Sequence, residues 1–405
     1  SWDTTVKTGD FTAVSGVGYF VNTTSGEIDV TLPASPSAGS VVAVKDYANT
    51  WDTHNCILLR NGSKIGSVAN DAILSTEGLA VTLVYVDATQ GWLVTDDGNQ
   101  SVASTNPFLA ATGGTETESG NFRIHTFTGP GTFSVTKLAT SSPNNALDYL
   151  IVAGGGGAGA REGSGGGGAG GFRETPGTST GSYTVSPIAG SIASFNATVT
   201  AFPVVIGGGG SGGSGANRGT DGSNSSFNGN SSVGGGSGGR GNGAAGGDTA
   251  FNGNPGGSGG GSGGRGPSSA GSGNTPPTSP AQGKNGGTAK TCSSNTADAG
   301  GGGGGATGTA LNASNPAGPG GDGGAGASTS ITGSSIGRAG GGGGGGNGVG
   351  GNGGGASDGG GAGTTNSDVN PGTANTGGGG GGIGATGGTG GSGGSGVVII
   401  RYKFQ

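Results

Sequence analysis

The stretch Gly387-Gly-Thr-Gly-Gly-Ser-Gly-Gly-Ser-Gly396 repeats glycine with a period of three residues, and it decides how most of this chain can fold. Shorter copies of the pattern occupy 209–215 and 320–326, while Gly300–Gly305 and Gly340–Gly346 are unbroken glycine runs. Because glycine has no side chain, such a region cannot build an ordinary apolar core. It is either a disordered linker or a body held together by backbone hydrogen bonds between closely packed segments.

The three-residue period fits a left-handed extended helix with 3 residues per turn and a rise of about 3.1 Å per residue. Such a helix has no internal hydrogen bonds, so neighbouring helices must supply partners for its N–H and C=O groups. Ordering one residue costs about 1–2 kcal/mol, and a net hydrogen bond contributes only about 1 kcal/mol. We therefore expect a bundle of many polyglycine II helices, built from eight glycine blocks: 154–171, 207–219, 234–247, 256–266, 300–308, 318–326, 337–363 and 377–396.

Composition excludes several classes of protein. Glycine accounts for 110 of the 405 residues, only 29% are hydrophobic, and the low charged fraction of 9% differs from that of disordered chains. The 16 lysines and arginines are scattered singly, so we expect no nucleic-acid partner. No apolar run approaches the roughly 20 residues of a membrane span, which predicts no membrane insertion. The start of the chain shows no signal peptide, so release of an exterior protein by cell lysis is one expectation.

Residues 1–102 predict a compact all-β module, a small sandwich that attaches or oligomerises. Residues 27–32 alternate polar and apolar side chains and place Ile28, Val30 and Leu32 on one face of a strand. Turn residues separate the other strand candidates, as in a small sandwich. These candidates are Phe11–Val14, Val17–Val21, Val41–Lys45, Cys56–Arg60, Ala80–Val86 and Trp92–Thr95.

We expect residues 103–120 to form a linker, followed by a glycine-rich domain over 121–405. In that domain, a β platform would comprise 121–206 and 397–405, and the polyglycine II bundle would occupy about 154–396. The predicted fold class is therefore all-β: a small N-terminal β-sandwich, followed by a β platform that carries a glycine-rich helix bundle.

Two strand patterns support the platform. Phe122–Phe127 and Thr132–Leu138 flank Thr-Gly-Pro-Gly, which predicts a β-hairpin. The final strand, Val397–Phe404, puts Val398, Ile400, Tyr402 and Phe404 on one face. A flexible tail would not usually end in residues of such strong β propensity. We expect the chain to leave the platform, form the bundle and return to close the sheet.

The sequence offers little for catalysis or metal binding. His54 and His125 lie in different modules and lack metal-ligand spacing to cysteine. Cys56 and Cys292 also fall in different modules, so we expect free thiols.

A glycosidase needs two carboxylates fixed on a rigid cleft. Glu162, Glu174 and Asp248 are carboxylates that border glycine blocks instead. We therefore predict no enzyme activity, no catalytic residue, no cofactor and no metal.

The loops between glycine blocks are the candidate binding elements, because loops on a rigid scaffold usually carry recognition. They span 217–232, 267–299, 309–317, 327–336 and 364–376 and are rich in Asn, Ser, Thr and Pro. Amide and hydroxyl groups suit sugar hydroxyls. The candidate contact residues are Asn217, Arg218, Phe227, Asn228, Phe251, Arg265, Lys284, Asn312 and Asn366. The alternative is that these loops only cap the bundle.

The junctions between strands and glycine runs resemble those in the glycine-rich domain of phage tail fibre and adhesin proteins. The resemblance covers about 121–405, although the insert 175–206 is longer than is usual in the family. It rests on Phe122–Phe133, Asp148–Gly157, Gly165–Arg173 and Gly393–Tyr402. In the N-terminal module, Gly18–Gly26 and Val30–Gly39 are similar to small β modules of cyanophage and marine-phage virion proteins.

This resemblance implies a non-enzymatic virion protein, extracellular and part of a tail or fibre, that displays variable loops to a host receptor. The implied partners are further copies of the chain in a homotrimer, other virion tail proteins and a host cell-surface receptor such as a glycan. Two alternatives stay open. One is a purely structural virion protein such as a decoration, spike or baseplate component, and the other is a bacterial glycine-rich cell-surface protein.

Overall fold

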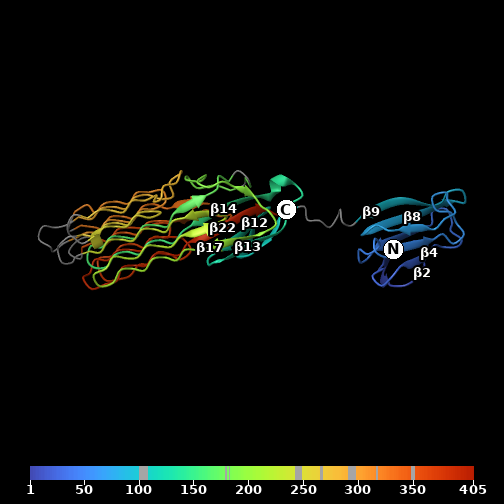
Figure 1. Cartoon of the computed structure of the whole chain (residues 1–405), viewed down its shortest axis with the longest axis horizontal. Helices are drawn as coiled ribbons and strands as arrows, with labels where there is room; N and C mark the ends of the chain where they lie inside the picture. Colours follow the sequence, from blue (N-terminus) through green and yellow to red (C-terminus); the bar gives the residue numbers. More distant parts are fainter. Residues whose placement is uncertain are drawn as a thin grey trace. The chain divides into compact units, whose positions relative to one another are not determined.

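A computed structural model shows an all-β protein, as the sequence predicts. Its described helical elements are two short 3-10 turns, η1 (Ser142–Asn145) and η2 (Thr249–Phe251). The chain divides into two compact units, Ser1–Asn106 and Pro107–Gln405 (Figure 1). The structure describes residues 1–99, 108–177, 180–181, 183–241, 249–264, 268–290, 298–315, 318–347 and 352–405.

The N-terminal unit is a two-sheet sandwich in which the first six strands alternate between the sheets. Neighbours among these six strands are parallel, so the chain winds as a coil, whereas the last three strands pair antiparallel. One sheet contains β1 (Trp2–Lys7), β3 (Val17–Val21), β5 (Val41–Asp46), β8 (Leu79–Asp87) and β9 (Gly91–Asn99). The other contains β2 (Phe11–Thr12), β4 (Ile28–Thr31), β6 (Cys56–Leu59) and β7 (Ala72–Leu74).

The predicted alternation in β4 is confirmed, because Ile28, Val30 and Leu32 are all buried between the two sheets. Trp51 and Trp92 are the largest side chains in this core. Strands β1 and β7 were not predicted, since β1 is mostly polar and β7 is only three residues long.

The C-terminal unit begins with a platform of two sheets. The final strand, β22 (Val397–Lys403), lies between β12 and β14 and is antiparallel to both, so the returning chain closes the sheet as expected (Figure 1). That sheet contains β11 (Thr115–Ser119), β12 (Phe122–Phe127), β22, β14 (Ala146–Val152) and β15 (Phe172–Glu174), with β16 (Phe195–Asn196) also on β14. The second contains β10 (Ala110–Thr112), β13 (Gly131–Lys137), β17 (Ala201–Val205), β18 (Ser225–Phe227) and β19 (Asn230–Ser232).

The predicted common face of the final strand is confirmed. Val398, Ile400 and Tyr402 are buried in the core between the sheets, and Phe404 packs against that core. Val397 and Ile399 point to the opposite face, where they join a second cluster on the bundle side. Both faces of this strand are therefore covered, which fits its position inside the sheet.

Two predictions for the platform are wrong. The proposed linker 103–120 contains strands β10 and β11, and β11 pairs along β12, while its first residues, 103–107, lie outside the described part of the chain. Strand β11 alternates threonine and glutamate, which suits an exposed edge strand. Because this polar composition is also typical of a linker, the strand was not predicted from the sequence. The proposed hairpin of β12 and β13 does not form, because these strands enter different sheets. The Gly-Pro-Gly turn reverses the chain but does not decide which strands pair.

The glycine-rich bundle is held by backbone hydrogen bonds that follow the three-residue period. In segment 154–160, every third residue donates to the same neighbouring segment, with N–O distances of 2.8 to 3.2 Å. The three rows of donors bond three segments: Gly154, Gly157 and Ala160 bond 217–223, Gly155 and Ala158 bond 391–394, and Gly156 and Gly159 bond 165–168. This pattern is the one expected of packed polyglycine II helices.

Glycine is required in the bundle because neighbouring backbones approach closely. A Cβ atom on Gly303 would lie closer than 3.0 Å to the carbonyl oxygen of Gly167, and one on Gly341 would meet Gly303 in the same way. The glycine hydrogen in that direction therefore faces a carbonyl oxygen, as in the weak Cα–H···O contacts between adjacent strands. Any side chain at these positions would force the helices apart.

The longest unbroken glycine runs lie in the interior of the bundle. The unbroken runs Gly300–Gly305 and Gly340–Gly346 are buried throughout. In some triplet segments the third residue is exposed, as at Ser211, Ser214 and Asp322, whereas Ser237, Ser258 and Ser262 are buried. The longest unbroken runs thus form helices surrounded by other helices, whereas the third residue of a Gly-Gly-X triplet faces solvent in some segments and the bundle interior in others.

Gly303→Ala tests this requirement, with Gly208→Ala as the matched control. We expect Gly303→Ala to destabilise the C-terminal unit by about 3 kcal/mol, since its methyl group overlaps a backbone oxygen. Gly208 is exposed, and a Cβ there meets nothing within 4 Å, so its substitution should change stability by less than about 0.5 kcal/mol. Chemical denaturation of the full chain measures both, and equal effects would contradict the close-packing explanation.

Candidate functional site

Exposed turns at one end of the bundle form the strongest candidate binding surface. Segment 154–160 leaves the platform after β14 and spans about 20 Å at polyglycine II rise before the chain turns at 161–163. Three further turns lie at the same end. We call 161–163, 214–218, 364–368 and 385–389 the outer turns.

Hydrogen bonds connect the outer turns to one another and to the glycine helices. Arg161 Nε donates to the carbonyl oxygen of Gly215 at 2.8 Å. The backbone N–H of Gly163 donates to Ile383, just before the fourth turn, at 3.1 Å. Gly384 donates to Asn366 at 3.2 Å. The glycine-rich bundle therefore holds these turns together as one surface.

Two of the predicted contact residues, Asn217 and Asn366, lie exposed on the outer turns. Asn366 Nδ2 donates to Asp368 Oδ2 at 2.7 Å, and Asn366 Oδ1 accepts from the Asp368 backbone at 2.9 Å. Asn217 Nδ2 donates to Ser214 at 3.1 Å. These bonds order polar side chains that still face solvent, an arrangement that reduces the entropy cost of binding a ligand.

Arg218 also lies on an outer turn, but its guanidinium group serves the bundle. The side chain is half-buried and donates to Asn254 Oδ1 and to the carbonyl oxygen of Thr249. Because this guanidinium group already donates hydrogen bonds to two residues of the bundle, its role is to stabilise the bundle. We therefore place Arg218 next to the binding surface but do not count it as a free contact.

Phe227 and Asn228 are corrected, because they belong to the platform. Phe227 is buried in the core, with ring centroids 5.1 Å from Tyr149 and 6.1 Å from Phe133. Asn228 and Gly229 have positive φ and form the turn of the β18–β19 hairpin. Asn-Gly between two short strands is the usual sign of such a hairpin, and it could have been read from the sequence.

Phe251 is also corrected, since it is buried inside the bundle. The guanidinium carbon of Arg240 lies 4.5 Å from its ring centroid, which is the geometry of a cation–π contact. Neither side chain is placed to touch an external ligand. The prediction failed because composition alone does not distinguish a loop aromatic that packs inward from one that faces solvent.

The other candidates are dispersed. Lys284 is part of a glycine helix, where its backbone bonds Gly305 and Gly259 at 3.0 Å each. Asn312 is exposed, but its Oδ1 caps the backbone N–H of Thr288 at 2.7 Å. Arg265 lies outside the described residues.

Of the three carboxylates that border glycine blocks, Glu174 has a structural role in the platform. Glu174 is buried and accepts hydrogen bonds from Ser186 N at 2.8 Å and Thr329 Oγ1 at 2.5 Å. Burial raises the pKa of this carboxyl group. Glu162 lies on an outer turn, and Asp248 lies outside the described residues. Glu174 therefore ties the β20–β21 hairpin (Ala327–Thr329 and Ile336–Arg338) to the platform.

The described residues contain no group of three or more His, Cys, Asp or Glu side chains placed to share a metal ion. Cys56 is buried and unpaired, and burial raises the pKa of its thiol to about 12, so it is a poor nucleophile. Cys292 lies outside the described part of the chain. Within the part that the structure describes, no helix has the length and apolar character needed to cross a bilayer.

The fold and this surface define a class of protein in which a β platform carries a body of backbone-bonded glycine helices. A family model described as a glycine-rich domain matches residues 126–403, which is more than half of the chain. The chain therefore belongs to the glycine-rich domain family. A comparison with curated proteins found no match.

Phe227→Ala distinguishes the core residue from the exposed candidate Asn217. We expect Phe227→Ala to lower the free energy of unfolding by about 3–5 kcal/mol, because it empties a buried aromatic site. Asn217→Ala should change it by less than about 0.5 kcal/mol, as for most surface positions. Chemical denaturation provides the measurement, and a mild effect of Phe227→Ala would restore it as a candidate contact.

Proposed function

We propose that this protein is a non-enzymatic tail fibre or adhesin component of a phage virion that recognises a host receptor through the outer turns. One observation carries the proposal. Exposed amide and carboxylate groups are held in fixed positions by hydrogen bonds, on turns that the glycine lattice ties together. Recognition surfaces in proteins commonly consist of such loops on a rigid scaffold.

The chemistry of the outer turns favours a polar ligand. Asn217, Asn366, Asp368 and Thr386 are exposed and offer both hydrogen-bond donors and acceptors. No aromatic residue occurs in the outer turns, so stacking on a sugar ring has no partner there. A hydroxylated glycan bound through hydrogen bonds, or a polar protein loop at the host surface, fits this set of groups.

The rest of the proposal concerns assembly. The N-terminal sandwich would attach the chain to other tail proteins, and further copies of the chain would complete a trimeric fibre outside the cell. The sandwich supports this role because several large apolar side chains are exposed on it, among them Trp2, Tyr47 and Ile73. Apolar side chains of this kind mark a protein interface where they form one contiguous patch.

Adsorption of the purified, fluorescently labelled chain to a panel of bacterial strains tests the proposed function. We expect strain-selective binding, because receptor recognition differs between hosts. The double variant Asn217→Gly with Asn366→Gly should reduce binding about tenfold or more, as expected when contacts worth about 1.4 kcal/mol or more are lost.

The matched control replaces Ser334 and Ser335, which are exposed in the β20–β21 hairpin, by glycine. This hairpin lies beside the platform, since Gly333 approaches Ser119 of β11. We expect the control to bind like the unmodified chain, with both variants showing unchanged circular dichroism. Equal binding by all three proteins would reject the outer turns as the contact surface and favour a purely structural virion role.

A further inference from the structure

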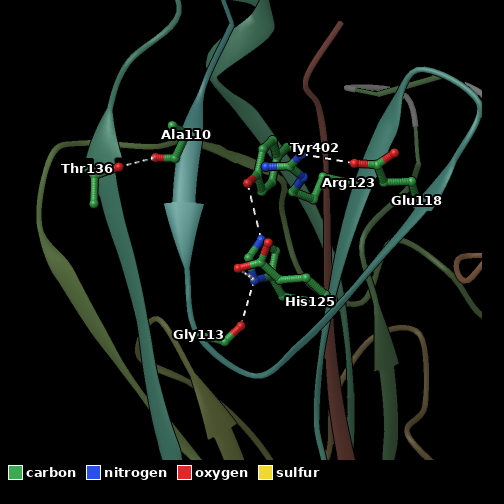
Figure 2. A network of polar contacts seen from close by, with 8 residues as sticks. Ala110, Gly113, Glu118, Arg123, His125, Thr136 and Tyr402 are labelled. Carbon is green, nitrogen blue, oxygen red and sulfur yellow. Dashed lines mark hydrogen bonds and ion pairs between the residues drawn. The ribbon is translucent and has the colours of Figure 1, made fainter.

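His125 lies at the centre of a buried polar network in the platform (Figure 2). Its side chain projects from β12, and its Nδ1 atom is 2.6 Å from the carbonyl oxygen of Gly113, in the turn between β10 and β11. A carbonyl oxygen can only accept, so Nδ1 carries the hydrogen. This bond fixes the tautomer of the neutral ring.

The second ring nitrogen contacts the final strand of the chain. Nε2 of His125 is 3.1 Å from the hydroxyl oxygen of Tyr402 on β22, and the two rings are stacked with centroids 5.6 Å apart. Because Nδ1 holds the ring hydrogen, Nε2 must accept and the Tyr402 hydroxyl must donate. The neutral imidazole thus links the β10–β11 turn to the middle of the sheet.

The charged groups around the ring act in opposite directions. Burial holds the pKa of His125 below its ordinary value of 6.5, and Arg123 on the same strand adds to this effect. Glu116 on β11 lies 3.9 Å from Nδ1 and opposes it. Arg123 is itself paired with Glu118 of β11 at 2.9 Å, and burial raises the pKa of Tyr402 to about 12, so that hydroxyl stays protonated.

We propose that His125 is an acid-sensitive clamp that holds the segment 113–119, the turn and strand β11, on the platform and releases it in mild acid. A proton added at Nε2 turns this acceptor into a donor that points at the Tyr402 hydroxyl. The hydroxyl oxygen can then only accept from Nε2, so the hydroxyl hydrogen must turn away from the ring and loses Nε2 as its acceptor. A buried donor without an acceptor destabilises the arrangement.

The segment is suited to local release. Strand β11 is at the edge of its sheet and pairs with β12 alone, and β10 is likewise an edge strand next to β13. Residues 115–118 are exposed, so little apolar burial opposes their departure. The turn between the strands, Gly113–Gly114, has positive φ at both residues, a conformation that needs the glycines and that the His125 bond holds directly.

The inference goes beyond the proposed receptor recognition, because the clamp lies in the platform and uses none of the outer turns. The direction of the pH response follows from the lowered pKa of His125. The clamp is complete above about pH 6.5 and weakens as the pH falls towards the folded-state value.

Hydrogen–deuterium exchange of the full chain at about pH 7.5 and about pH 5 tests the clamp. After correction for the pH dependence of intrinsic exchange, amides in 115–119 should exchange about tenfold faster at the lower pH. Amides in β14 should keep their protection at both pH values and serve as the internal reference. Equal protection of 115–119 at both pH values would overturn the proposal.

His125→Asn is the decisive variant, because the asparagine amide can replace Nδ1 as the donor to Gly113 but does not titrate. We expect its exchange in 115–119 to be the same at both pH values. The proposal fails if this variant loses protection in acid as the unmodified chain does, since Glu116 or Glu118 would then be responsible.

An NMR titration of the histidine ring nitrogens in the unmodified chain keeps the test valid even where the variant does not fold. Protonation of His125 must follow the same pH midpoint as the loss of protection in 115–119. Different midpoints would separate the two events and reject the clamp. As a further check, Tyr402→Phe removes the opposing hydroxyl and should raise exchange of the segment already at about pH 7.5.

Discussion

Backbone hydrogen bonds between glycine segments are the interaction on which this structure depends. Each glycine helix has no internal hydrogen bonds, so it exists only because its neighbours accept its N–H groups in three rows. Segments 154–160 and 165–171 each bond three different neighbours in this way. The stability of any one helix therefore rests on several others, and the bundle should order cooperatively rather than helix by helix.

The platform fixes the two ends of the glycine-rich bundle. Strand β14 runs directly into the first glycine segment, and β22 begins where the last one ends, so both ends of the bundle are covalently continuous with paired strands. The packed side chains of the platform fix where the first helix starts. From that starting position, backbone hydrogen bonds alone can position each further glycine helix against the helices already in place.

Much of this architecture could be predicted from the sequence because period and burial are physically linked. The three-residue repeat predicted the bundle, and the alternation of Val398, Ile400 and Tyr402 predicted their shared buried face. The predictions that failed concerned which strands pair with each other and which side chains pack together. The turn before Gly131 signalled a reversal, yet pairing of β12 with β22 depends on a strand about 270 residues later in the chain. Phe227 was misplaced for the same reason, because its core is assembled from distant segments.

The candidate site was only partly predictable from the sequence, and the packing of the glycine helices explains why. At an interior position such as Gly303, any side chain collides with a neighbouring backbone, so these residues cannot vary and cannot contact a ligand. Outward positions such as Ser211, together with the outer turns, are the places where the bundle tolerates a change of side chain. Variation in binding must therefore collect there. The sequence identifies the turns by their composition, but only the packing shows that Asn217 and Asn366 face solvent while Phe251 does not.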